Sequence, residues 1–175
     1  MTAIGDMHVL IVDDNAQMRA LLRALLRAGG FLFISEAETA EAGVRIIGRA
    51  RADLIILDWK MAPIDGLAFT RLLRNGETDA NPCTPILMLT AHTEGSRVTA
   101  ARDAGVTGFL KKPISAQNLL DRVAAALTDT RLFVRSADFF GPDRRRGQAL
   151  RYVGPLRRCT DGAETLDLDD IRLIA

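Results

Sequence analysis

Polar residues stand at the ends of four short apolar runs, and their types could do chemistry together. They are Asp13 and Asp14 after HVLIV, Asp58 after LIIL, Thr90 after ILML, and Lys111 and Lys112 after VTGFL. Two carboxylates about 4 Å apart repel by roughly 4 kcal/mol at an effective dielectric near 20, so a group of three favours a divalent cation. Mg²⁺ typically binds one or two carboxylates and fills its other positions with water and phosphate oxygens. With a hydroxyl and an ammonium group nearby, such a site suits phosphoryl chemistry, in which a carboxylate can itself be the nucleophile.

These residues can meet only if the apolar runs lie side by side in one sheet. The runs that read as strands cover 8–13, 31–35, 54–57, 86–90 and 106–110. Several are almost continuously apolar, as in parallel strands covered on both faces. Helical periodicity lies between them, with Gly29 and Gly105 as stop signals and Ser115 as the N-cap of a last helix. Five strand–helix repeats predict an α/β fold with a doubly wound parallel sheet, whose functional groups collect beyond the carboxyl ends of its strands.

The motifs VDD, LDWKM, LTA and KKP follow one another along these repeats. Each alone is common, but together, each at a strand end, they closely resemble the receiver domain of two-component response regulators. The resemblance covers residues 7–128 and leaves 129–175 as an Arg-rich C-terminal extension. It implies a flavodoxin-like sheet with strand order 2-1-3-4-5. It also implies a phospho-acceptor with slow autophosphatase activity rather than an enzyme in the usual sense.

The resemblance gives each strand-end residue a role. Asp58 would accept the phosphoryl group. Mg²⁺ would be held by Asp14, Asp58 and the backbone carbonyl of Lys60, with Asp13 reaching the ion through water. Thr90 would bond the phosphoryl group. Lys112, the lysine directly before proline, would pair with it, and Lys111 is the alternative.

Three further residues carry roles implied by the family pattern. Phe109 stands at the aromatic switch position, where a ring follows Thr90 toward the phosphoryl group; plain core packing is the alternative. Lys60 and His92, two residues beyond Asp58 and Thr90, would influence how water reaches that group and would lengthen its lifetime. The alternative for both is an ordinary solvated loop residue.

Two prolines bear on the loops around these residues. The family usually has proline four residues after the acceptor, whereas this chain has Ala62 there and Pro63 one position later, so the loop keeps its length but changes its stiffness. Pro113 would fix the turn after the last strand, and the resemblance implies that it does so through a cis bond, as is frequent in this family.

Arginines on two segments are candidates for binding a partner. Arg19, Arg23 and Arg27 recur every four residues on the first helix, which suggests a docking stripe for an acidic phosphotransfer partner; a solvated face is the alternative. In the extension, residues 131–158 hold eight arginines, among them Arg144, Arg145 and Arg146, and residues 159–175 are acidic. The extension also holds four of the nine aromatic residues, so it is not typical of disorder. A partner-binding or regulatory arm, nucleic-acid binding and a structural extension all remain open.

Composition limits the remaining classes. The net charge is +1, no apolar segment is long enough to span a membrane, and the first residues do not read as a secretory signal. Cys83 and Cys159 are far apart, without a CxxC pair or nearby histidines, so we expect no zinc site, no disulfide framework and a reduced cytoplasmic protein.

The sequence therefore predicts a bacterial response regulator in phosphorelay signal transduction. A histidine kinase or histidine phosphotransfer protein would supply the phosphoryl group. The output would be a protein-interaction surface formed by the fourth helix, fifth strand and fifth helix, with homodimerisation on that face as one form. Two other classes stay open. One is a DNA-binding regulator acting through the extension. The other is an aspartate-nucleophile phosphatase, although that class places its nucleophile in a DxD arrangement on the first strand.

Overall fold

The computed structural model describes residues 3–91, 95–136 and 139–143. A short 3₁₀ turn, Ile4–Asp6, precedes five strands that alternate with five helices. The strands are β1 (His8–Val12), β2 (Phe33–Ala37), β3 (Leu54–Asp58), β4 (Ile86–Thr90) and β5 (Gly108–Lys111). The helices are α1 (Ala16–Ala28), α2 (Ala40–Ile47), α3 (Gly66–Asn75), α4 (Gly95–Ala104) and α5 (Ala116–Leu127).

The five strands form one parallel sheet in the order β2-β1-β3-β4-β5. The predicted doubly wound α/β fold is therefore confirmed, including its strand order. β3 lies at the centre between β1 and β4, so all of its residues are buried. This position explains why LIIL is apolar without alternation: both faces of the strand are covered.

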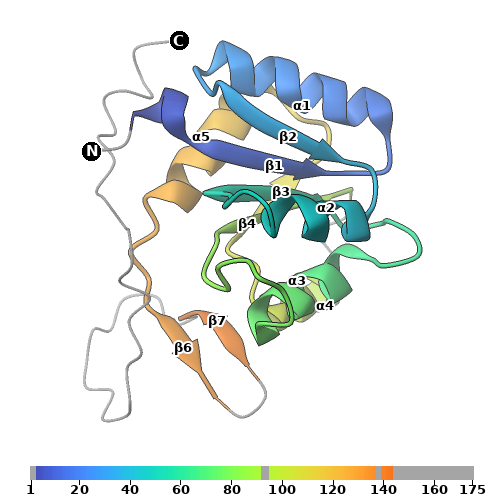
Figure 1. Cartoon of the computed structure of the whole chain (residues 1–175), viewed down its shortest axis with the longest axis vertical. Coiled ribbons are helices and arrows are strands. Elements are labelled where there is room, and N and C mark those ends of the chain that lie inside the picture. The colour runs from blue at the N-terminus through green and yellow to red at the C-terminus, as the bar shows by residue number, and fades with distance from the viewer. Residues whose placement is uncertain (1–2, 92–94, 137–138, 144–175) are drawn as a thin grey trace.

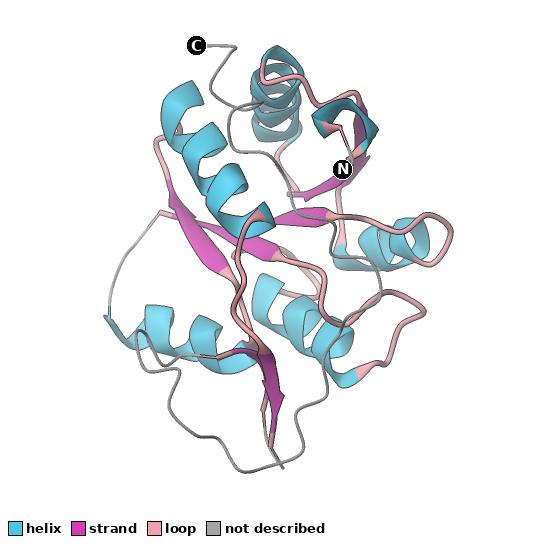
Figure 2. Cartoon of the chain, turned by 90° about the vertical axis from the view of Figure 1, so that its left-hand side faces the viewer, coloured by secondary structure: helices cyan, strands magenta, loops and turns pink. Residues whose placement is uncertain are grey.

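Helices cover both faces of the sheet (Figures 1 and 2). Alternate strand residues point to opposite faces, so Val9 and Ile11 pack with α1 and α5, whereas Leu10 and Val12 pack with the helices of the other face. The first core also holds Leu22, Leu26, Leu119 and Val123; the second holds Ile47, Phe69, Leu73 and Ala101. The two cores fix every strand from both sides, and with it the position of the residues at its carboxyl end.

Two strands begin two residues later than the sequence predicted. β2 starts at Phe33 rather than 31, and β5 at Gly108 rather than 106. Gly30 and Gly105 each adopt a positive φ after a helix, and the next residue donates its N–H back to that helix, Phe31 to Leu26 O and Val106 to Ala101 O. These residues are apolar because they close helix ends against the core, not because they pair in the sheet.

Helix starts follow the predicted chemistry. The Ser115 side chain accepts a hydrogen bond from the Asn118 N–H, which confirms it as the N-cap of α5. Asn15, Thr39 and Asp65 cap α1, α2 and α3 in the same way. Within the described part of the chain, no helix has the length and apolar character that a membrane span needs.

Two features lie outside the predicted pattern. Cys83 is disulfide-bonded, so the expectation of no disulfide is wrong for this residue; Cys159 lies outside the described residues. After α5, the strands β6 (Phe133–Arg135) and β7 (Phe140–Pro142) pair antiparallel as a separate hairpin, so at least this part of the extension is folded.

The contrast between two leucines on α1 tests this packing. Leu26 is fully buried in the core between α1 and the sheet, whereas Leu21 is 42% exposed. We expect Leu26→Ala to lower the free energy of unfolding by about 2–5 kcal/mol, because it leaves a cavity under the helix. Leu21→Ala should change it by no more than about 0.5 kcal/mol. Urea denaturation measures both, and equal losses would contradict the assigned orientation of α1.

Candidate functional site

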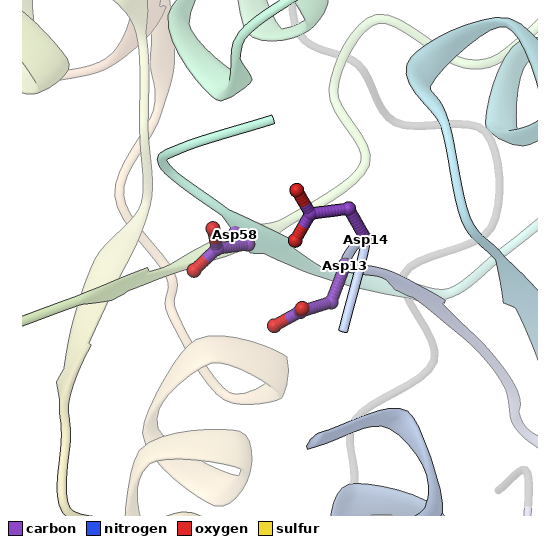
Figure 3. Close-up of side chains that lie close together, drawn as sticks. All are labelled: Asp13, Asp14 and Asp58. Atoms are coloured by element: carbon purple, nitrogen blue, oxygen red, sulfur yellow. The ribbon is translucent and has the colours of Figure 1, made fainter. Parts of the chain in front are cut away.

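Three aspartates meet at the carboxyl edge of the sheet (Figure 3). Asp13 and Asp14 follow β1, and Asp58 is the last residue of β3. One carboxylate oxygen from each lies within 4.8 Å of the others. Asp13 and Asp58 are buried, and Asp14 is exposed, so the group opens to solvent on the Asp14 side.

Backbone hydrogen bonds hold Asp13 in place. Its own N–H donates to Ala37 O at the end of β2, and its Oδ1 accepts from the Asn15 N–H at 2.8 Å. Arg19 Nη1 donates to the Asp13 carbonyl at 2.7 Å. The residue is therefore fixed by the neighbouring strand, by the start of α1 and by a side chain one turn into that helix.

Asp58 is positioned by the loop that follows it. Its Oδ2 accepts from the Lys60 N–H at 2.9 Å. The Trp59 N–H donates to Leu89 O, and the Gly66 N–H returns to Trp59 O, so the loop folds back over the end of β3. A Cβ at position 66 would lie 2.4 Å from the Asp58 carbonyl oxygen, which explains why a glycine begins α3. Both Ala62–Pro63 and Lys112–Pro113 are cis, the second as predicted.

Lys112 joins the two buried carboxylates. Its Nζ lies 2.7 Å from Asp58 Oδ1 and 3.5 Å from Asp13 Oδ2. Its N–H donates to the carbonyl of Thr90, whose side chain is buried at the end of β4. Lys111 lies opposite Thr90 in the strand register and is exposed. Of the two adjacent lysines, the structure thus places Lys112 against the acids.

The pKa values of these groups reflect their crowding. Burial raises the pKa of Asp13, and the charge of Asp58 raises it further, against the lowering effects of the Asn15 N–H and of Lys112. Burial alone would lower the pKa of Lys112, but its hydrogen bond to Asp58 and the charges of Asp58 and Asp13 outweigh it, so the net shift is upward. The charge of Asp58 thus makes ionisation of Asp13 less favourable, and Lys112 offsets this effect only in part.

A hard divalent cation fits this donor set. The candidate ligands are oxygens only, two of the three carboxylates are buried, and the third is exposed beside an open side. Mg²⁺ prefers oxygen ligands and keeps several positions for water or phosphate oxygens, so an open group of this kind suits it better than a closed structural site. Asp13, Asp14 and Asp58 are the side chains that would hold such an ion.

Phe109 and Lys60 border the site in different ways. Phe109, on β5, is half-buried and packs against the core on the α2–α3–α4 side of the sheet. It also lines a cleft of about 890 Å³ on the α4–β5–α5 face. The Lys60 side chain is exposed beside Asp58. His92 and the arginines Arg144, Arg145 and Arg146 lie outside the described residues.

Two of the three arginines predicted to form a docking stripe on α1 are engaged in contacts within the chain. Arg19 and Arg23 both pair with Glu36 on β2, and Arg27 alone among the three lacks such a contact within the described residues. The Arg19 side chain is only 15% exposed, and it also donates to the Asp13 carbonyl. Sequence reasoning missed this positioning role, because nothing in the helical spacing of the arginines shows that Glu36 and the Asp13 carbonyl lie beside them.

The comparisons with known proteins agree with this geometry. The family model of the response regulator receiver domain matches residues 9–124. The chain is 32% identical over 117 residues to the chemotaxis protein CheY of Pseudomonas aeruginosa, covering 67% of this chain and 93% of that protein. It is 37% identical over 176 residues to the protein PetR of Rhodobacter capsulatus, covering 100% of this chain and 68% of that protein.

Solved structures give the same result. The chemotaxis response regulator CheY4 of Vibrio cholerae superposes with a TM-score of 0.64 at 29% identity, covering 69% of this chain and 98% of that one. The receiver domain of the sensor histidine kinase PA1611 of Pseudomonas aeruginosa, solved with a magnesium ion in its active site cleft, gives a TM-score of 0.62 at 26% identity and covers 69% and 96% of the two chains. The strand order, the acidic group at the carboxyl edge and the match over residues 9–124 together show that this chain belongs to the response regulator receiver domain family.

Proposed function

We propose that this chain is a phosphorelay protein that accepts a phosphoryl group on Asp58 in the presence of Mg²⁺. One observation carries the proposal: the Asp58 carboxylate lies 2.7 Å from Lys112 Nζ and shares a site open to solvent with Asp13 and Asp14. The magnesium ion in the related PA1611 receiver domain supports the choice of metal. Family membership argues against the aspartate-nucleophile phosphatase.

The transfer step follows from the positions of these groups. An oxygen of the Asp58 carboxylate forms a new bond to phosphorus while the bond between phosphorus and the donor's leaving atom breaks, and the leaving group keeps that electron pair. Lys112 pairs with the negative charge of the transferred group, and the Lys60 N–H keeps the second oxygen of Asp58 oriented. Bound Mg²⁺, held by the three aspartates and the backbone carbonyl of Lys60, would supply charge neutralisation between the carboxylates and the incoming anion.

The switch proposal starts at Thr90. Its hydroxyl would bond the new phosphoryl group and draw the following loop toward Asp58, and Phe109 would follow. Because Thr90 O accepts the Lys112 N–H, β4 and the loop that carries Lys112 are linked at the site. The α4–β5–α5 face would then bind a downstream protein or a second copy of the chain. We place this exchange in the cytoplasm, with a histidine kinase or a phosphotransfer protein as donor.

Phosphoryl uptake tests the central claim. Incubated with acetyl phosphate and Mg²⁺, the wild-type protein should gain the mass of one phosphoryl group, and Asp58→Asn should not. Removing divalent cations with EDTA should abolish the gain, because repulsion among the carboxylates and the anion is then no longer offset. Intact-protein mass spectrometry reads all three samples. A wild-type protein that gains no phosphate from acetyl phosphate or from candidate kinases would contradict the proposal.

Adjacent lysines provide a matched pair for the charge-pairing role. Lys112→Met should slow phosphoryl uptake from acetyl phosphate by roughly 100-fold, the scale of removing one charge-stabilising donor from a reaction centre. Lys111→Met should leave the rate near that of wild type, since Lys111 is exposed and it is Lys112 that pairs with Asp13 and Asp58. Time courses by mass spectrometry compare the two variants. Equal uptake rates in the two variants would contradict the assignment of the pairing role to Lys112.

The Lys60 side chain is proposed to lengthen the phosphorylated lifetime by pairing with phosphoryl oxygens. Lys60→Ala should then lose its phosphoryl group faster, by up to about fivefold, because an exposed ion pair contributes at most about 1 kcal/mol. After removal of the donor, phosphate release from the two proteins is followed over time. An unchanged rate would show that Lys60 is an ordinary solvated loop residue.

A further inference from the structure

The β6–β7 hairpin lies below the sheet in Figure 1, beside α3 and α4. It contacts Arg74 in the last turn of α3 and Gly105 directly after α4, and Arg131, just before the hairpin, contacts Thr107 in the loop that precedes β5. Since the strands are parallel, this loop lies at the amino end of the sheet, whereas Asp13 and Asp58 lie at the carboxyl ends of their strands. The hairpin therefore contacts the receiver fold far from the phosphorylation site.

Arg74 is buried where the hairpin contacts the receiver fold. It is 2% exposed, and its guanidinium donates to three carbonyls: Nε to Gly105 O at 3.0 Å, and Nη1 to Pro82 O at 2.5 Å and Thr84 O at 2.8 Å. No carboxylate among the described residues pairs with it, and Nη2 has no hydrogen-bond partner there. Burial lowers the pKa of Arg74 to about 9, so the guanidinium still carries its proton at neutral pH.

The hairpin completes the surroundings of this buried charge. The Phe133 ring of β6 lies 5.1 Å from Arg74 Cζ, the distance of a cation–π contact. Phe133 in turn packs against Phe140 of β7, with ring centroids 5.6 Å apart. The ring excludes water from the guanidinium and presents to it the negative face of its π-system, which stabilises the charge in the absence of a carboxylate partner. Arg74 and the hairpin therefore stabilise each other.

Two glycines face each other where the hairpin meets the end of α4. A Cβ on Gly141 of β7 would lie 2.7 Å from the Cα of Gly105, and a Cβ on Gly105 would lie 2.6 Å from the Phe140 carbonyl oxygen. Gly105 is the positive-φ residue that ends α4. The backbone of β7 thus rests directly on the carboxyl end of α4, with no side chain between them that could adjust to a shift.

The segment between α5 and β6 is held beside the end of α4 by Arg131. Arg131 Nη2 donates to Thr107 O at 2.9 Å, and the guanidinium pairs with Asp129. Arg131 and Pro142 also line the cleft on the α4–β5–α5 face, whose wall includes Phe109. One continuous cavity therefore runs from the proposed switch residue to the extension.

α4 connects the two ends of the molecule. It begins at Gly95, a few residues after Thr90, and ends at Ala104, directly before the glycine on which β7 rests. A helix of 10 residues is about 15 Å long and moves as a rigid unit, so a displacement at its start reaches its end. Packed interfaces of this kind hold one arrangement or another rather than deforming continuously.

We propose that the β6–β7 hairpin is a strap docked on the end of α4 in the unphosphorylated chain, and that phosphorylation of Asp58 releases it. This inference rests on the proposed function. The Gly105–Gly141 contact leaves no room for the two backbones to approach, so a shift of the helix after phosphorylation either forces them together or separates them. In both cases docking weakens, and the exposure of Arg74 and of the hairpin amides changes together with the state of Asp58. By linkage, a docked hairpin disfavours the phosphorylated conformation by the same factor.

Hydrogen exchange of the full chain tests the strap. The reporting amides are those of Ser136, which donates to Phe139 O, and of Asp143, which donates to Leu132 O. With acetyl phosphate and Mg²⁺, both should exchange about 5- to 150-fold faster, the usual range of coupling between two sites. Mass spectrometry of the same sample reports how much phosphate is bound, and Asp58→Asn should show no change in exchange.

Two variants with a matched control test the contact between the hairpin and α4, before and after acetyl phosphate is added. Gly141→Ala places a methyl group against the Gly105 backbone, and Phe133→Ala removes the ring over Arg74; both should already exchange fast and respond little to acetyl phosphate. Gly48→Ala is the control, because a Cβ there meets nothing closer than 3.4 Å. It should behave as wild type. Unchanged exchange of β1 and β3 amides in every variant shows that the receiver fold is intact.

The outcomes separate the two proposals. If the wild-type protein gains phosphate but the amide exchange of its hairpin does not change, phosphorylation does not release the hairpin. The proposed phosphoryl-acceptor function would then still stand. A protein that gains no phosphate overturns that function and the release with it. Gly141→Ala and Phe133→Ala proteins that both exchange like wild type overturn the docked strap itself.

Discussion

Repulsion among the three carboxylates is the constraint on which the rest of the structure depends. Asp13 and Asp58 are buried within a few ångströms of each other, a costly arrangement that the fold must hold in place by other means. It does so with continuous apolar strands covered on both faces, with backbone N–H groups directed at both acids, and with Lys112 between them. The folded sheet and its helices can be regarded as a scaffold that keeps these acids together at one edge.

The sequence predicted much of this scaffold for a physical reason. Parallel strands buried on both faces must be apolar along their whole length, so a polar residue that ends such a run is conspicuous, as Asp58 is after LIIL. Because all strands run in one direction, such residues also meet in space. The order of the strands came from the resemblance to a family, since periodicity alone does not determine which strand lies beside which.

What the sequence did not predict depends on contacts between distant segments. Phe31 and Val106 look like strand residues, and only the positive φ of the preceding glycines shows that they close helix ends. Arg19 looks like part of a charged helix face, yet it bonds the Asp13 carbonyl and pairs with Glu36. Arg74 reads as an ordinary basic residue in the last turn of a helix, and its burial becomes visible only once the loops before β4 and β5 lie beside it.

The burial of Arg74 has a consequence for modularity. An arginine of α3, a glycine that ends α4 and two phenylalanines of the hairpin form one contact set, although the sequence pattern places them on both sides of a boundary near residue 128. Exchanging the extension between members of the family would leave a buried cation without its aromatic cover, or would set a hairpin against a helix end with no room for it. The receiver unit and the hairpin are therefore packed as one unit, although the sequence pattern divides them.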